Sequence, residues 1–205
     1  MAVKLSNTRS YNTVMDGLWR DHPISSMVLG ICSALAVSNK VENALAMGAG
    51  VIFVLLATGI IVSVLRKLIP RRVRIITYMV TIASFTIIVD RYLDAFYPEI
   101  REAIGPYAGL IITNCIIMGR AEAFYIQNNP FQSILDALAN GVSYTYTLTS
   151  MALIRELLGF GTVLGFRIMP EGFTPWVVMV MAPGAFFVLA VFLWVTRTMA
   201  RVEPE

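Results

Sequence analysis

The sequence predicts an all-α integral membrane protein with six transmembrane segments, arranged as two inverted-topology repeats of three helices. Composition is the first reason: 57% of the residues are apolar, 14% are charged and the mean hydropathy is +0.71. Roughly a quarter of the residues are charged in a typical soluble domain. The other reasons are six apolar segments separated by charged loops, and one pattern that occurs in both halves.

The six apolar segments differ in length. They cover about 24–37, 44–65, 73–93, 106–119, 131–154 and 175–196. A helix over the first or fourth, about 14 residues each, reaches roughly 21 Å, which is short of the ~30 Å hydrocarbon core. The other four are long enough to span it. Short apolar segments that end in glycine and charge are typical of helices broken inside the membrane. Segments one and four are therefore expected to be half-helices.

The two short segments share a pattern. P-I-S-S-M-V-L-G-I-C at 23–32 and P-Y-A-G-L-I-I-T-N-C at 106–115 both place a cysteine nine residues after a proline, and two long apolar segments follow each. The whole chain, 1–205, is then one membrane domain, with repeat 1 at about 23–96 and repeat 2 at about 106–196. Three crossings per repeat is an odd number, so the second repeat inserts upside down relative to the first. Chance similarity of two apolar segments is the alternative.

Loop charge predicts the orientation. With six crossings, one side of the membrane receives eleven Lys and Arg residues, five of them between positions 66 and 74, and the other side receives five. Cytoplasmic loops carry the excess of positive charge, which places both termini in the cytoplasm. The net charge of +3 needs no nucleic-acid partner.

The cysteines at equivalent repeat positions, Cys32 and Cys115, have several readings. A free cysteine often only fills space in a core. A mid-membrane disulfide does not suit a chain with cytoplasmic termini. Zinc usually takes four ligands, and no histidine accompanies these residues. An iron–sulfur cluster takes four thiolates, so two from this chain would need a partner that supplies the others.

Two motifs around these cysteines resemble a known family. L-G-I-C-S-A-L-A-V at 29–37 and L-I-I-T-N-C-I-I-M-G-R-A-E-A-F at 110–124 are similar to the half-helix motifs of the D subunit of the sodium-translocating NADH:quinone reductase (Nqr). They are also similar to the homologous E subunit of the Rnf complex, a ferredoxin:NAD oxidoreductase. Ser33 and the run 113–118 favour the Nqr form, whereas V-E-N-A-L-A-M-G at 41–48 is closer to Rnf.

The resemblance implies a cofactor, partners and a location. It implies a [2Fe–2S] cluster at the centre of the membrane, with Cys32 and Cys115 as two ligands. A homologous membrane protein of opposite topology, the E subunit of Nqr or the A subunit of Rnf, supplies the other two. Other subunits carry flavins, and the complex lies in the bacterial inner (cytoplasmic) membrane, in contact with its lipid.

Small residues beside the cysteines are candidates for the surroundings of the cluster. Ser33, Thr113 and Asn114 are potential hydrogen-bond donors that tune its potential, or residues that allow close helix packing. Gly30 and Gly119 would let the backbone approach the cluster, or are simply glycines of membrane helices.

Charged residues follow both short segments: Lys40 and Glu42 after the first, and Arg120 and Glu122 after the second. Charges at membrane depth are costly and indicate a function with a specific partner. We favour local ion pairs that stabilise the helix breaks, and a gate or ion path is the alternative.

Polar residues also occur within or near the long segments. S-Y-T-Y-T-L-T-S at 143–150 suits either a Na⁺ path or, as favoured here, hydrogen bonds between helices. Asp90, Asp94 and Asp136 are expected at the membrane interfaces because they lie near segment ends.

The favoured function is a subunit of an ion-translocating oxidoreductase that relays electrons across the membrane from NADH to quinone. The chain is expected to have no NADH site of its own, because G-F-G-T-V-L-G at 159–165 follows a membrane helix rather than a strand. The same role in an Rnf-type complex is the alternative. An inverted-repeat secondary transporter with incidental cysteines, or a structural scaffold, are readings of another class.

Overall fold

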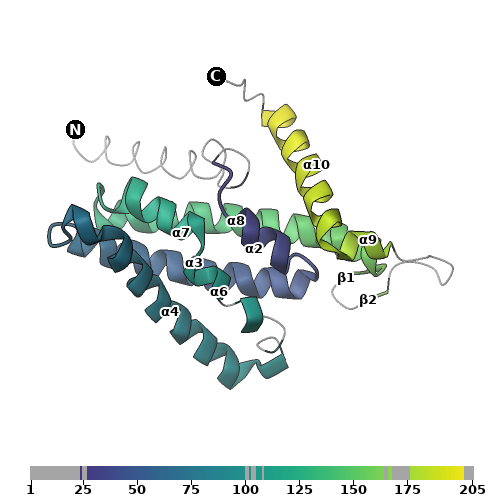
Figure 1. Ribbon diagram of the computed structural model, residues 1–205, viewed down its shortest axis with the longest axis horizontal. Coiled ribbons are helices and arrows are strands. Elements are labelled where there is room, and N and C mark those ends of the chain that lie inside the picture. Colours follow the sequence, from purple (N-terminus) through teal and green to yellow (C-terminus); the bar gives the residue numbers. More distant parts are fainter. Residues whose placement is uncertain are drawn as a thin grey trace.

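Helices form almost all of the molecule. The computed structural model describes residues 24, 27–99, 102, 105–107, 109–163, 166–167 and 176–200. The only strands in that part of the chain, β1 (Thr162–Val163) and β2 (Phe166–Arg167), form a short antiparallel hairpin. The all-α prediction is therefore confirmed (Figure 1). The first residue of the predicted repeat, Pro23, and both termini lie outside the described residues.

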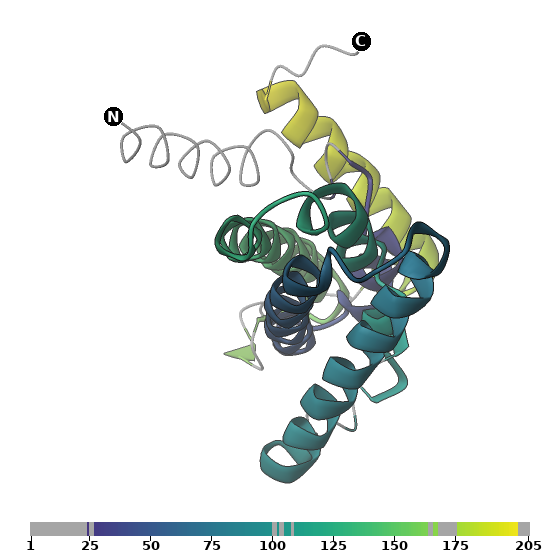
Figure 2. The ribbon, with the colours of Figure 1, turned by 90° about the vertical axis from the view of Figure 1, so that its left-hand side faces the viewer.

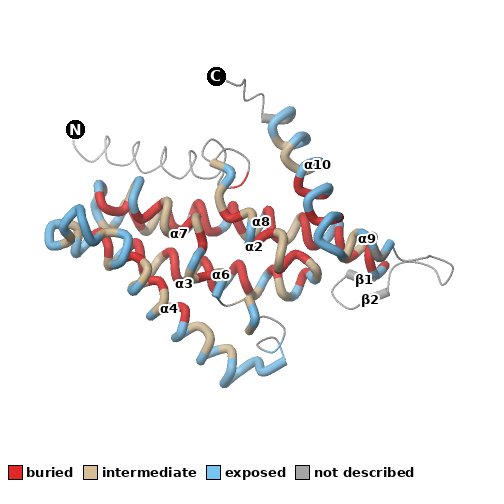
Figure 3. The backbone as a smooth tube through the Cα atoms, in the orientation of Figure 1, coloured by how far each residue is buried: buried red, intermediate tan, exposed pale blue. Residues whose placement is uncertain are grey.

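Two long antiparallel helices form the centre of the molecule, α3 (Val41–Leu65) and α8 (Pro130–Gly159). Glycines allow them to approach closely: a Cβ on Gly48 would lie 2.6 Å from the Thr145 side chain, and one on Gly141 would lie 2.7 Å from Ile52. Small residues bring membrane helices together in this way. Most of the buried residues lie on these helices and on the short segments beside them (Figure 3).

The two short apolar segments are interrupted, as predicted. In the first, Val28 and Gly30 have positive φ angles of 57° and 78°, so α2 begins later than predicted and covers only Ile31–Val37. In the second, α6 (Gly109–Ile112) stops before Asn114, whose side chain caps α7 (Cys115–Arg120). A π-helical turn, η4 (Ala121–Tyr125), continues α7. The 3₁₀ turn η3 (Gly105–Tyr107) precedes α6.

The last apolar segment is also interrupted, which the sequence pattern did not predict. It forms α9 (Val177–Val180) and α10 (Ala182–Ala200), with a bend between them. Pro183 has no N–H to donate to the carbonyl of Met179, four residues earlier, so the helical ladder fails at this point. The prediction of one continuous helix over 175–196 is therefore wrong.

The outer helices diverge from the central pair. The 3₁₀ turn η2 (Arg71–Val73) leads into α4 (Arg74–Phe96), which extends away from α3, and α10 leaves the opposite part of the molecule (Figures 1 and 2). Residues 41–65 and 71–96 are long and apolar enough to cross a membrane, and Ala182–Thr198 is a shorter apolar helix. Much of α4 and α10 is exposed in this chain (Figure 3).

Candidate metal centre

The fold brings the two cysteine segments together. Cys32 is the second residue of α2 and Cys115 is the first residue of α7. The backbone N–H of Gly30 donates a hydrogen bond to Cys115 Sγ at 2.8 Å, across a sequence separation of 85 residues. Cys32 is exposed and Cys115 is half-buried. Both thiols are therefore accessible from the surface of this chain.

Gly30 has a specific role in this contact. Its φ of 78° lies in the left-handed region that favours glycine. A Cβ at this position would lie 2.5 Å from Ile116 Cδ1 and 3.1 Å from a ring carbon of Tyr144. The N–H therefore reaches Cys115 only because position 30 has no side chain. The backbone at Gly30 thus approaches the Cys115 sulfur closely.

A tyrosine that the sequence pattern did not single out joins the site. Tyr144, on α8, is fully buried, and its hydroxyl lies 2.5 Å from Ser33 Oγ. Asn114 lies close enough to interact with the same hydroxyl. The only sequence signal was the polar stretch 143–150, for which we favoured hydrogen bonds between helices. Tyr144 makes such a bond, but Thr145, Thr147 and the other hydroxyls with identified partners bond to carbonyls of their own helix.

Thr113 and Gly119 lie beside the site without a contact to sulfur. The Thr113 hydroxyl is exposed and donates to the carbonyl of Gly109, one turn earlier. A Cβ on Gly119 would lie 3.2 Å from Leu29 Cδ1. Gly119 thus leaves room for the segment that precedes α2, and the structure assigns it a packing contact.

The charged residues of the second repeat form ion pairs, but not with each other. Arg120 and Asp136 form a buried ion pair between α7 and α8. Glu122 accepts from Arg74 at 3.1 Å and from the Tyr78 hydroxyl at 3.0 Å, both on α4. Residues two apart on a helix do not face each other. Arg120 and Glu122 therefore form structural ion pairs with residues of α8 and α4 rather than with each other. Asp136 is completely buried within the chain.

The charges of the first repeat behave differently. Lys40 and Glu42 are exposed, and neither forms an ion pair within the described residues. The backbone N–H of Val41 between them donates instead to Glu156 at 2.8 Å. The predicted local ion pair is therefore replaced by a contact from the end of α8.

Arg155 lies beside Glu156 in the same part of the molecule, and the sequence pattern did not reveal its role. It is buried and donates to the carbonyls of Leu35, Met179 and Val180 and to Ser38 Oγ. The loop-charge count placed Arg155 and Arg120 in loops, although both are buried. The signal in the sequence was a charged doublet, 155–156, directly after an apolar run.

The chain matches the Rnf-Nqr family of membrane-protein subunits over residues 10–193. It belongs to this family. The resemblance drawn from the two cysteine motifs is thereby confirmed, and the chain is a membrane protein.

Curated relatives cover nearly the whole chain. A protein of Chlamydia trachomatis serovar L2, named as the D subunit of the Na(+)-translocating NADH-quinone reductase, is 42% identical over 204 residues, 94% of this chain and 96% of the relative. One of the same name from Psychromonas ingrahamii is 43% identical over 192 residues, 90% of this chain and 91% of the relative.

The geometry fits half of the ligand set of an iron–sulfur cluster. Such clusters are held by four thiolates, and in the described part of this Rnf-Nqr chain no group of three or more His, Cys, Asp or Glu side chains converges. Both thiols are at least partly open to the surface, and Cys115 accepts a hydrogen bond from Gly30, two residues before Cys32. The site can therefore hold a cluster together with a partner's ligands.

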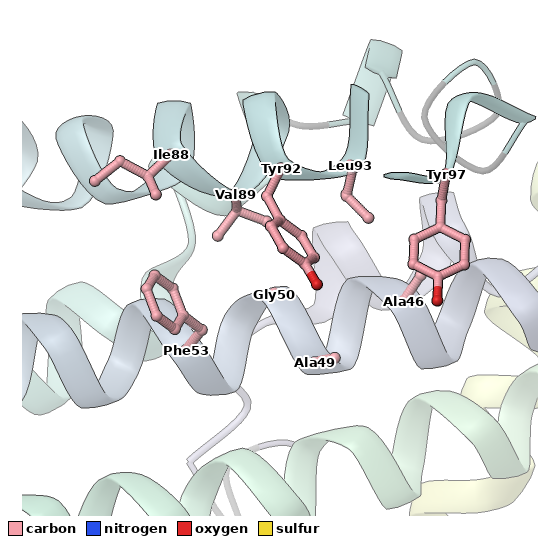
Figure 4. Close-up of a pocket in the computed structure, with 9 residues that line it drawn as sticks. All are labelled: Ala46, Ala49, Gly50, Phe53, Ile88, Val89, Tyr92, Leu93 and Tyr97. Atoms are coloured by element: carbon pink, nitrogen blue, oxygen red, sulfur yellow. The ribbon is translucent and has the colours of Figure 1, made fainter. Parts of the chain in front are cut away.

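A separate cavity lies between α3 and α4 (Figure 4). Its volume is about 430 Å³, and its nine lining residues, which include Gly50, Phe53, Tyr92 and Tyr97, carry no charge. None of these lining residues is a cysteine, so the cavity is separate from Cys32 and Cys115.

Proposed function

We propose that this chain is a membrane subunit of a sodium-translocating NADH:quinone reductase. We further propose that Cys32 and Cys115 supply two ligands of a [2Fe–2S] cluster shared with a partner subunit. The observation that carries the proposal is the pair of accessible thiols, from two distant segments, beside one hydrogen bond from Gly30. The names of the relatives support the complex and the sodium ion.

The partner would be the homologous protein of opposite topology, which in an Nqr complex is the E subunit. Neither thiol is enclosed by this chain, so a second surface is able to close over them. A cluster bound there would supply a one-electron carrier between the redox groups on the two sides of the membrane. This chain's contribution is to hold two thiolates, to donate one hydrogen bond to sulfur, and to exclude water on the α8 side with Tyr144.

The topology that goes with this function is the six-segment inverted repeat in the bacterial inner membrane, with both termini in the cytoplasm. The packing supports it by its symmetry. In the described residues α4 packs on α6 and α7, and α10 packs on α2; likewise α3 contacts α7, and α8 contacts α2. If α2, α3 and α4 of the first repeat correspond to α6–α7, α8 and α10 of the second, each of these contacts has a matching contact in the other repeat. A two-fold relation between the repeats requires such matching.

Replacement of the cysteines tests the proposal. The whole complex is purified with Cys32→Ser, Cys115→Ser or both, and iron content and the EPR spectrum of the reduced protein are compared with wild type. We expect each variant to lose about two irons and the [2Fe–2S] signal, because a cluster needs its four thiolates. Ser150→Ala is the control, since the Ser150 hydroxyl only bonds to the Tyr146 carbonyl of its own helix.

Assembly of the complex, measured by size-exclusion chromatography, separates loss of the cluster from loss of the protein. An assembled double variant that keeps its iron, its EPR signal and its electron transfer would overturn the cluster and would favour a transporter whose cysteines are incidental.

A further inference from the structure

Tyr144 is the residue where the two cysteine segments meet. Its hydroxyl contacts Ser33, the residue after Cys32, at 2.5 Å. It also lies beside Asn114, the residue before Cys115. A buried tyrosine hydroxyl requires a polar partner. Here the partners come from both short segments, and the tyrosine itself comes from a third element, α8.

The hydrogen bonds have a direction. Ser33 Oγ donates to the carbonyl of Gly30 at 3.1 Å, so its single proton is used and Tyr144 is the donor to Ser33 Oγ. Gly30 in turn donates its N–H to Cys115 Sγ. A chain of contacts therefore runs from Tyr144 through Ser33 and Gly30 to the sulfur of Cys115.

Asn114 is the polar residue of the second short segment that lies near Tyr144. Its Oδ1 accepts from the N–H of Ile116 at 3.1 Å and so caps α7. Its buried Nδ2 makes no hydrogen bond within the described part of the chain. The hydrogen bonds that link Tyr144 to Cys115 are therefore those through Ser33 and Gly30.

These polar contacts do not follow from the repeat. Ser33 follows Cys32, but Ile116 follows Cys115; Asn114 precedes Cys115, but Ile31 precedes Cys32. The polar groups occupy non-equivalent positions in the two halves, and the Tyr144 hydroxyl lies near both of them. Ordinary packing of two similar half-helices needs no such arrangement.

We propose that Tyr144 is a positioning residue for the metal centre, which fixes the two thiols relative to each other through Ser33, next to Cys32, and through Gly30, which binds Cys115. This inference rests on the proposed function, in which Cys32 and Cys115 hold a cluster. Without the hydroxyl, Ser33 loses a donor and the Gly30 turn loses its support. The hydrogen bond from Gly30 to Cys115 then weakens.

Loss of that hydrogen bond changes the potential of the cluster in a defined direction. Hydrogen bonds to ligand sulfurs help to set the potential, and they stabilise the reduced form most because it carries more negative charge. Weakening the bond therefore lowers the midpoint potential. If Tyr144 only filled space, removing its hydroxyl while keeping its aromatic ring would not change the potential.

Tyr144→Phe tests the proposal in the purified complex. We expect an assembled protein whose cluster has altered EPR g-values and a lower midpoint potential in a redox titration, or a cluster that is lost from an otherwise intact complex. Tyr146→Phe is the matched control, because Tyr146 lies two residues away on the same helix and is 66% exposed. Wild-type EPR and potential in Tyr144→Phe would overturn the proposal.

Ser33→Ala provides a second route if Tyr144→Phe does not assemble. It removes the bond to Tyr144 and also the bond from Ser33 to the Gly30 carbonyl. Its potential should therefore shift in the same direction and at least as far as in Tyr144→Phe, and the double variant should show no shift beyond that of Ser33→Ala. Additive shifts would overturn the chain of contacts. A cluster retained in Cys115→Ser would instead overturn the proposed function, so the two failures are distinguishable.

Discussion

The contact between Gly30 and Cys115 depends on a backbone conformation that few residues adopt. Gly30 combines a φ of 78° with a space in which Ile116 and Tyr144 leave no room for a methyl group. Both features direct its N–H to a sulfur 85 positions away. A single glycine thus determines how the first short segment meets the second.

Gly30→Ala should therefore damage both stability and the metal centre. An alanine at this φ costs about 1–2 kcal/mol, and overpacking against Ile116 adds about 1–3 kcal/mol. We expect a lower midpoint of thermal denaturation for the purified complex and a changed cluster EPR spectrum. Gly109→Ala is the control, since a Cβ there meets nothing within 4 Å. Equal stability of the two variants would contradict the role of Gly30.

Individual residues differ in how far the sequence reveals them. Cys32 and Cys115 could be paired because a proline precedes each at the same spacing. Tyr144 and Asp136 could not be placed, because which face of α8 is buried depends on contacts with α2, α3 and α7 rather than on local sequence. A long helix that is apolar on several sides gives no periodic signal to identify its buried face.

At the scale of elements, Arg155 connects two helix breaks. The α9–α10 bend leaves the carbonyls of Met179 and Val180 without their helical N–H partners, and the guanidinium donates to them at 3.1 and 2.9 Å. The same group donates to the Leu35 carbonyl at 3.2 Å and to Ser38 at 2.6 Å at the end of α2. Arginine suits this position because its fork of donors is fixed in geometry.

Arg155→Met should loosen both breaks together. Each buried carbonyl left without a donor costs about 1–3 kcal/mol, so we expect a clear fall in thermal stability. We also expect faster proteolysis at the ends of α2 and α9 in detergent-solubilised complex. Arg91→Met is the control, because Arg91 is an exposed arginine on α4. Unchanged proteolysis at α2 would show that Arg155 does not hold that element.

The broken segments show which elements sequence reasoning can find. The first and fourth apolar segments are too short for a full span, and both are interrupted in the structure. The third interruption, at Pro183, was missed because segment six has enough apolar residues for a complete crossing. Length reveals a break only where residues are lacking, whereas this break follows from the missing N–H of Pro183. Arg155, from another helix, donates to the carbonyls that the break leaves free.

At the scale of the whole molecule, the segments that flank α3 and α8 meet at the two ends of this helix pair. Arg66, after α3, donates to the Gln127 carbonyl and to Asn129, which precede α8. At the other end, the N–H of Val41, the first residue of α3, donates to Glu156 near the end of α8. These contacts agree with the six-crossing order, in which residues 66–74 share one side of the membrane with 120–130. Without the buried Arg120 and Arg155, the loop charges still divide ten against four.

Single cysteines at exposed loop positions test this topology in whole cells. Leu68→Cys lies in the basic loop and Glu99→Cys lies after α4; both positions are exposed. A membrane-impermeant maleimide applied to spheroplasts should label only position 99, because the proposed orientation places the basic loop in the cytoplasm. Labelling of position 68 should appear only after the membrane is opened. The parent protein, with its two native cysteines, gives the background.

The second repeat provides the decisive pair of positions. If it is inverted relative to the first, Asn128→Cys should behave like position 68, and Phe160→Cys should behave like position 99. A repeat in the same orientation would require the opposite behaviour of 128 and 160. Since Arg66 already lies against the 127–129 turn, labelling of 68 and 128 from different sides would contradict both the six-segment topology and the packing of α3 on α8.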